Sequence, residues 1–298
     1  MAAVPVTPPG PTDNSTTTLP VRVITPHSSL EGFRSAARSL VTGFTAACHL
    51  AWRFFLRDTR ADYRQSLLGY VWLVVPALAN VVVWTFLNSE NVIRVDSGSV
   101  PYPIFVLSAT IIWTAFNSSV MGMLGLINAA RGLFSKVNFP HESLVYSAFM
   151  KVTTDAFLAS AILIPALLIY NVAPTREAFL FPVALFTSLL LGAAAGLILV
   201  PVAALYTDVS RAVQVLLRFG FFVTPVIFPL PAEGLARRLM LNNPVTPVVV
   251  SGRSFITGSE EAMPTALALV GAGSLVLALF ALLIYKVALP FVVERLGG

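Results

Sequence analysis

The apolar residues of this chain are gathered in long runs that contain few charged side chains. A run of about 20 apolar residues is long enough to cross the hydrocarbon core of a bilayer as a helix. Runs of this kind predict five membrane spans, at residues 67–89, 103–128, 144–175, 179–206 and 262–285. The fourth run holds no charge over its whole length.

The stretch between the fourth and last of these runs follows a different pattern. It contains two charge-free runs, 219–232 and 239–252, of only 14 residues each. Runs of 10–14 residues are more typical of buried, interfacial or re-entrant segments. The first run reaches spanning length if its helix extends back through Arg218, which predicts a further span at about 212–230.

Two prolines interrupt the second short run. Pro244 and Pro247 would each remove a helical hydrogen bond. We therefore expect re-entrant half-helices over 232–258, between the fifth and sixth spans. Six spans would leave both ends of the chain on the same side of the membrane.

Composition supports the same class of protein. Hydrophobic residues make up 56% of the 298 residues, charged residues only 11%, and the mean hydropathy is +0.81. These proportions exclude a soluble domain and a largely disordered chain. The single Cys48 excludes a disulfide scaffold, and a β-barrel would alternate polar and apolar residues. The sequence predicts an all-α polytopic membrane protein.

The positions of lysine and arginine predict the orientation. Only Arg94 lies between the first two spans, whereas seven arginines precede the first: Arg22, Arg34, Arg38, Arg53, Arg57, Arg60 and Arg64. The positive-inside rule then puts both termini in the cytoplasm. Three arginines after the fifth span run against this trend: Arg237, Arg238 and Arg253.

Four regions follow from these patterns. Residues 1–27 are rich in proline, serine and threonine and have no apolar signal core, so we expect a disordered cytoplasmic tail. Residues 28–66 mix arginines with aromatic residues, which is typical of an amphipathic helix on the inner leaflet, although a plain juxtamembrane anchor fits equally. Residues 67–290 form the six-span domain, and 291–298 a cytoplasmic end.

Several kinds of chemistry have no sequence signature here. None of the lysines, Lys136, Lys151 and Lys286, follows a glycine, so there is no phosphate-binding loop. The histidines are scattered and form no metal-binding pattern with Cys48. We expect no cofactor, no metal and no catalytic residue in this chain.

Six strings in one order resemble the permease subunits of polysaccharide-exporting ABC transporters. Val137-Asn138-Phe139-Pro140-His141-Glu142 resembles the family's aromatic-Pro-basic-Glu motif, with His141 in place of the usual arginine. The other strings are residues 57–72 followed by Pro76, 101–105 followed by Trp113, 206–211, 224–229 and 243–247. The resemblance covers roughly residues 50–290 and is greatest to the O-antigen and teichoic acid export branch.

The resemblance implies a homodimer of six-span subunits in the bacterial inner membrane. Two ATPase subunits would dock on the cytoplasmic side and bind ATP and Mg. The cargo would be a polysaccharide on a polyprenyl-diphosphate lipid, of O-antigen type, moved from cytoplasm to periplasm. Teichoic acid or capsule export is an alternative within the family.

The resemblance also suggests roles for particular residues. The residues expected to couple the permease to the ATPase are Phe134, Lys136, Asn138, Phe139, Pro140, His141 and Glu142. Candidates for the glycan channel are Trp113, Phe116, Phe221 and Phe222, and for the lipid diphosphate Arg211 and Arg218. The outer gate would use Pro229, Asn243, Pro244, Thr246 and Pro247.

Some of these residues have simpler interpretations. Arg211 and Arg218 are seven apart, hence on one helix face, where they could equally contact ordinary lipid phosphates. Lys151 and Asp155 are four apart, and we favour a pair that anchors the third span. Gly192 and Gly196 allow close helix approach, and we favour packing within the subunit over dimerisation.

Two other functional classes remain as alternatives. A membrane enzyme acting on lipid-linked sugars would carry acidic or basic catalytic groups in a membrane-face loop. Asp58 and Asp62 are close but lie among arginines at helical spacing, which favours surface ion pairs. A secondary transporter would carry internal repeats or several buried carboxylates, whereas Asp155 is the one candidate here.

Overall fold

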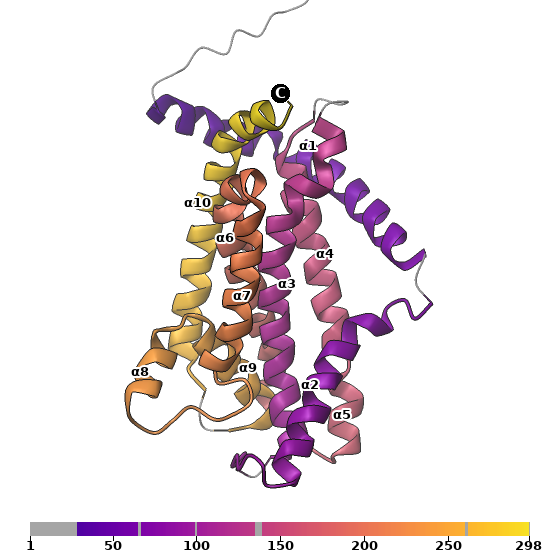
Figure 1. Cartoon of the computed structure of the whole chain (residues 1–298), viewed down its shortest axis with the longest axis vertical. Helices are drawn as coiled ribbons and strands as arrows, with labels where there is room; N and C mark the ends of the chain where they lie inside the picture. The colour runs from indigo at the N-terminus through magenta and orange to yellow at the C-terminus, as the bar shows by residue number, and fades with distance from the viewer. Residues whose placement is uncertain (1–28, 65–66, 99, 135–138, 260–261, 298) are drawn as a thin grey trace, which may run out of the picture.

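The computed structural model describes residues 29–64, 67–98, 100–134, 139–259 and 262–297, and all regular structure in these residues is helical. Long helices run side by side, and α1 crosses the end of the bundle where the C-terminus lies (Figure 1). The helices are α1 Ser29–Arg64, α2 Val71–Ser89, α3 Tyr102–Phe134, α4 Glu142–Ser160, α5 Leu163–Ile169, η1 Arg176–Leu180, α6 Phe181–Leu205, α7 Thr207–Val223, α8 Leu235–Asn242, α9 Val245–Thr257 and α10 Pro264–Gly297.

Five segments are long and apolar enough to cross a membrane. They are Val71–Ser89, Tyr102–Ala130, Glu142–Ile169, Arg176–Leu205 and Pro264–Val292. These segments coincide with five of the six predicted spans. The chain is therefore an all-helical, multi-pass membrane protein, as its composition predicts.

The predicted third span is a helix with a break. α4 ends at Ser160 and α5 begins at Leu163. Pro165 explains the break, because a proline ring clashes with the carbonyl four residues earlier, here that of Ala161, and offers no N–H to it. The predicted span also extends too far, since α5 ends at Ile169 and Asn171 adopts a left-handed conformation at φ 52°.

The predicted fifth span, 212–230, differs from the helix found there. α7 begins earlier, at Thr207, and ends at Val223. The end has a local cause: Thr224 is extended, with φ −102° and ψ 137°, as expected for a residue that precedes a proline. A helix of 17 residues is about 26 Å long, so the sixth crossing stays a prediction.

Close contact between α3 and α6 forms the centre of the bundle. A Cβ on Gly192 would lie 2.5 Å from the carbonyl oxygen of Phe116, and one on Gly196 would lie 2.5 Å from that of Val120. Only glycine permits this approach of two backbones. The prediction that these glycines serve packing within the subunit is confirmed.

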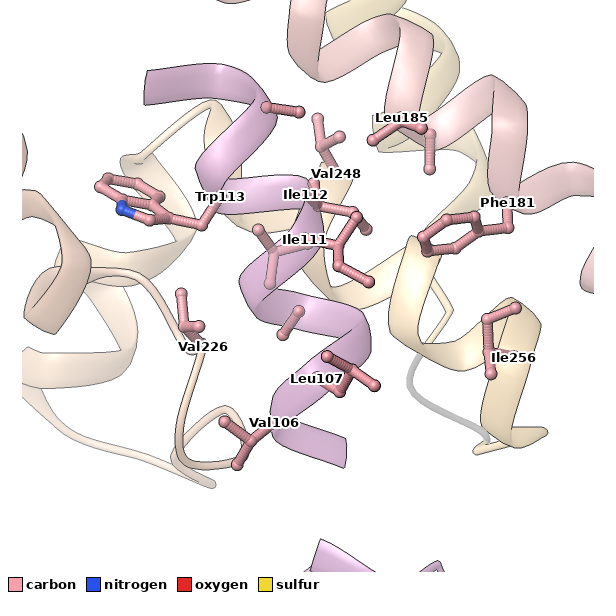
Figure 2. Packing of buried hydrophobic residues seen from close by; sticks show 14 of the residues in the cluster. Val106, Leu107, Ile111, Ile112, Trp113, Phe181, Leu185, Val226, Val248 and Ile256 are labelled. Atoms are coloured by element: carbon pink, nitrogen blue, oxygen red, sulfur yellow. The ribbon is translucent and has the colours of Figure 1, made fainter. Parts of the chain in front are cut away.

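Buried apolar side chains fill the space around this helix pair. Figure 2 shows residues of α3 packed against α6, α9 and the segment that follows α7. Among the largest fully buried side chains are Ile112 of α3, Leu185 of α6 and Val226. α9 is buried from Val245 to Ile256, so it belongs to the interior of the subunit.

The N-terminal helix, α1, lies within the region 28–66, whose predicted role as an interface helix stays a prediction. α1 packs against α4 and α10, and its exposed side includes Val41, Phe44 and Trp52. Its location on the inner leaflet stays a prediction. The predicted tail, residues 1–27, and Ser28 lie outside the described residues. α10 is unbroken to Gly297, so residues 291–297 prolong the last helix.

Substituting Gly196 by valine should separate α3 from α6. The new side chain would overlap the Val120 carbonyl, so we expect a loss of about 1–3 kcal/mol in the free energy of unfolding. Unfolding of the detergent-solubilised protein would be followed by circular dichroism. Gly273→Val is the control, because a Cβ at Gly273 meets nothing within 4 Å. Equal losses in both variants would contradict the close contact.

Candidate functional site

Side-chain hydrogen bonds fasten the turn that follows α7. The Tyr102 hydroxyl donates to the carbonyl of Ile227 at 2.9 Å. The Arg253 Nη1 donates to the carbonyl of Pro225 at 3.0 Å. The Asn243 Nδ2 donates to Thr224 Oγ1 at 2.8 Å. These bonds tie the turn after α7 to α3, to α9 and to Asn243, which lies between α8 and α9.

Arg253 is the most unusual of these residues, because it has no exposed surface. Its guanidinium carbon lies 3.9 Å from the centre of the Phe105 ring, a cation–π contact. Sequence reasoning missed this role and counted Arg253 only as an exception to the charge trend. The sequence signal that could have indicated this buried role is a single arginine in the charge-poor stretch after Pro244.

The predicted gate string, residues 243–247, forms the start of α9. Asn243 Oδ1 accepts a hydrogen bond from the Val245 N–H at 3.0 Å, which satisfies a donor at the helix start. Thr246 and Pro247 are buried within the subunit, whereas Pro244 is exposed and Pro229 is half-buried. The gate role of these residues stays a prediction.

The four predicted channel aromatics lie together. The Trp113 ring centre lies 5.5 Å from that of Phe116 and 6.1 Å from that of Phe221. Phe221 lies 5.4 Å from Phe222, which also meets Trp84 of α2 at 6.4 Å. The five rings therefore form one aromatic cluster, which joins α2, α3 and α7. Trp84 was not among the predicted channel residues.

Only part of this aromatic cluster reaches the surface of the subunit. Trp113 is buried, and Gly220 lets α7 approach it, since a Cβ there would lie 3.0 Å from the indole. Phe222 is 54% exposed. The cluster thus has an inner side that packs helices and an outer side available for contact.

The two predicted diphosphate ligands lie on one face of α7 with Phe222. Arg211, Arg218 and Phe222 follow at intervals of seven and four residues, and all three are exposed. Arg211 forms an ion pair with Asp208 at 3.3 Å, and both side chains are largely exposed to solvent. We call this surface the α7 face: cationic at its start, aromatic at its end.

At the other end of the bundle, the junction before α4 is closely packed. Phe139 is buried and packs edge-on against Phe54 of α1 at 5.8 Å and against His141 at 5.0 Å. The Tyr285 hydroxyl donates to the His141 carbonyl at 3.4 Å. Lys136, Asn138 and the Phe134 side chain lie outside the described residues.

Glu142 forms a buried ion pair in this junction. Lys286 Nζ of α10 donates to its carboxylate at 2.7 Å, and the two side chains are 22% and 7% exposed. Burial lowers the pKa of His141 below its ordinary value of 6.5, partly offset by Glu142. Lys286 lowers the pKa of His141 further, so the surroundings of the imidazole favour its neutral form. Pro140 and His141 are half-buried and hence the most accessible described part of the predicted coupling string.

Comparison with known proteins identifies the family. No family model matches the chain. The O-antigen export system permease protein RfbA of Myxococcus xanthus is 30% identical over 199 residues, which cover 65% of this chain and 75% of the relative. The chain belongs to the permeases of polysaccharide-exporting ABC transporters.

Two further relatives of the permease have related names. The polysialic acid transport protein KpsM of Escherichia coli is 24% identical over 180 residues, 59% of this chain and 68% of that protein. RfbA of Klebsiella pneumoniae is 21% identical over 208 residues, 68% and 78% of the two chains. Together with the five apolar helices, these relatives indicate a multi-pass inner membrane protein.

Replacing Glu142 by alanine should destabilise the permease more than an exposed charge does. Lys286 would be left partly buried without this carboxylate, at a cost of about 3–5 kcal/mol in the free energy of unfolding. Asp208→Ala, which opens the exposed pair with Arg211, is the control and should change little. The double variant Glu142→Leu/Lys286→Met should recover most of the loss. Equal effects of the two single variants would contradict the buried pair.

Proposed function

We propose that this permease exports a polyprenyl-diphosphate-linked polysaccharide of O-antigen type from the cytoplasm to the periplasm. Two copies form the conduit, and two ABC ATPase subunits, which bind ATP and Mg, drive it from the cytoplasmic side. The names of two relatives, both O-antigen export permeases, support the class of cargo.

The observation that carries the proposal is the exposed α7 face. Arg211 and Arg218 are exposed on α7, which is separated from the end of α6 by the single residue Tyr206. Charged side chains at membrane depth face protein or water, because contact with lipid tails costs several kcal/mol. A second copy of the permease, with a water-filled space between the two α7 faces, would meet that requirement.

The chemistry of this face fits the two parts of the cargo. Arginine binds diphosphate oxygens through strong charge-assisted hydrogen bonds. Phe222 follows the arginines along the helix and is joined by Trp84. Flat aromatic faces contact the C–H surfaces of sugars without fixed hydrogen bonds, which lets a polymer slide past. The arginines would thus receive the lipid diphosphate, and the rings would guide the glycan.

The ATPase would dock against the segment between α3 and α4. Its described part, from Phe139 to Glu142, is fastened to α1 and α10 by the Phe54 contact and the Lys286 ion pair. A displacement of this segment would therefore move two other helices with it. That rigid connection is what a coupling element requires.

We further propose that both termini are cytoplasmic and that α8 and α9 form a re-entrant hairpin at the periplasmic end. In Figure 1, α8 and α9 lie in the half of the bundle away from the C-terminus. The hydrogen bonds of Arg253 and Asn243 to the turn after α7 would let this hairpin open or close the outer mouth of the conduit.

Export of a capsule glycan is the second candidate. The similarity to the polysialic acid transport protein KpsM favours an acidic polymer as cargo, because polysialic acid carries a negative charge on each sugar. A cationic α7 face would suit such a polymer along its whole length, rather than only at a lipid diphosphate. The two proposals differ in where the negative charge of the cargo lies: along the glycan itself, or only on its lipid diphosphate.

Removing the α7 arginines should reduce export without affecting assembly. We expect Arg218→Gln, and Arg211→Gln to a similar degree, to lower glycan export by about 10–100-fold, since each loses a charge-assisted contact of about 1.5–3 kcal/mol. Export would be measured as surface glycan in cells, and assembly by copurification with the ATPase. Arg238→Gln on α8 removes the same charge elsewhere and should export normally. Normal export by both α7 variants would overturn the conduit.

Cysteine labelling tests the re-entrant hairpin. In a Cys48→Ser background, single cysteines at Arg237 and at Ser259 should both react with an impermeant thiol reagent added from the periplasmic side. The reason is that a hairpin returns to the side from which it enters. Labelling of one position from outside and of the other only from inside would reveal a further crossing and contradict both the hairpin and the cytoplasmic C-terminus.

A further inference from the structure

A hollow of about 450 Å³ lies among α1, α3 and α4, away from the α7 face. In Figure 1, α1 descends beside α4 at the end of the bundle that carries the C-terminus. Small residues make room for this hollow. A Cβ on Gly125 of α3 would meet nothing within 4 Å, and Ala129 and Ala148 line the opposite walls.

Charged side chains of both signs line this hollow. Arg57 and Asp58 come from α1, and Lys151 and Asp155 come from one face of α4. The Arg57 guanidinium is held in place, since its Nε donates to Asp58 at 2.8 Å and its carbon lies 5.0 Å over the Phe54 ring. An arginine fixed at Nε still has four other N–H groups to donate. The hollow thus contains a pre-oriented donor of the kind that binds phosphate.

Two further hollows adjoin it and share its residues. A basic one of about 480 Å³ on α1 includes Arg53 and Arg60, and shares Arg57 with the first. A smaller one of about 100 Å³ lies among α2, α3 and α4 and shares Asp155 and Val152. Its walls are mostly apolar and include Leu73, Ile111 and Ala159.

The three hollows share lining residues, and their walls change from charged on α1 to mostly apolar between α2, α3 and α4; together we call them the path. Four cations line the path, Arg53, Arg57, Arg60 and Lys151, against two carboxylates, Asp58 and Asp155. The charged part therefore carries a net charge of +2, and the path ends in an apolar gap between helices. An amphiphile with an anionic headgroup and a hydrocarbon chain matches both ends.

We propose that this path binds one anionic membrane phospholipid. The phosphate lies between Arg57 and Lys151, and the first part of an acyl chain enters the apolar gap between α2, α3 and α4. The carboxylates of Asp58 and Asp155 orient the two cations. The bound lipid holds α1 against the bundle. None of the residues that line the path belongs to α7, so the site is distinct from the proposed conduit on the α7 face.

The test uses the purified full-length chain in detergent. Native mass spectrometry should show one phosphatidylglycerol molecule retained per chain, and added phosphatidylglycerol should raise the midpoint of thermal unfolding. Phosphatidylcholine and inorganic phosphate should each fail to do so at the same concentration, because one lacks net charge and the other lacks a chain. Stabilisation by inorganic phosphate alone would overturn the lipid and leave only an anion site.

Variants locate the binding. Arg57→Gln and Lys151→Gln should each weaken phosphatidylglycerol binding by about tenfold, the effect of losing one charge-assisted contact. Gly125→Leu, which fills the hollow without changing charge, should weaken it as well. Arg238→Gln, on α8, and Gly273→Leu are the controls for charge and volume. Unchanged binding in the first three variants, or an equal loss in the controls, would overturn the site.

A final arm separates the proposed lipid from the proposed cargo. Polyprenyl phosphate is added in place of phosphatidylglycerol to the same variants. Retention of polyprenyl phosphate alone would overturn the phospholipid and make the path an entry site for cargo. If Lys151→Gln fails to fold, Arg57→Gln and Gly125→Leu still decide, since both lie where the hollow is open.

Discussion

A charged side chain within or beside a membrane-spanning helix must meet another polar group or water, because lipid tails offer neither. The permease meets this constraint in different ways at different places. Arg253 donates a hydrogen bond to the Pro225 carbonyl and lies over the Phe105 ring. Glu142 forms an ion pair with Lys286. Both arrangements lie within one subunit and hold helices together, although the Arg253 Nε makes no hydrogen bond within the described residues. The arginines of the α7 face remain at the surface, where Arg211 forms an ion pair with the exposed Asp208. In the proposed conduit, the rest of their polar surroundings would come from water, cargo or a second copy of the chain.

The packing divides the subunit into a rigid centre and a more loosely held helix. α3 and α6 approach to the limit set by Gly192 and Gly196, and α10 packs on α6. Most of α7 is exposed, and it packs on this centre through Leu217, which is buried with Val120 of α3 and Ala203 of α6. Near its end, Gly220 also lies against Trp113. In the proposed conduit, a movement of α7 would pass through the hydrogen bonds at Pro225 and Thr224 to α9 and to Asn243, the residue between α8 and α9.

Much of the fold could be predicted from the sequence, since spans follow from local composition alone. The charge-free runs predicted five spans, and the strings of the family predicted which family it is. The missed features depend on single prolines or on distant residues. Pro165 divides the third span and Thr224 ends α7, and neither interrupts an apolar run. Lys286 is 144 residues from Glu142 in sequence, and Tyr102 is 125 from Ile227, so no spacing rule could pair them.

The same comparison changes what the family strings mean. Asn243 satisfies the first turn of α9, Thr246 and Pro247 are interior, and Glu142 is bound to α10. These residues look functional in a sequence because they are polar or rigid in apolar surroundings, and the structure gives each a place in a junction between helices. Residues that contact cargo need no such fixed partner. Arg218 and Phe222 belong to none of the recognised strings, and they are exposed on α7 together with most of its side chains. The strings 137–142 and 243–247 therefore mark junctions between helices, whereas the proposed cargo surface lies on a helix that its own subunit leaves largely uncovered.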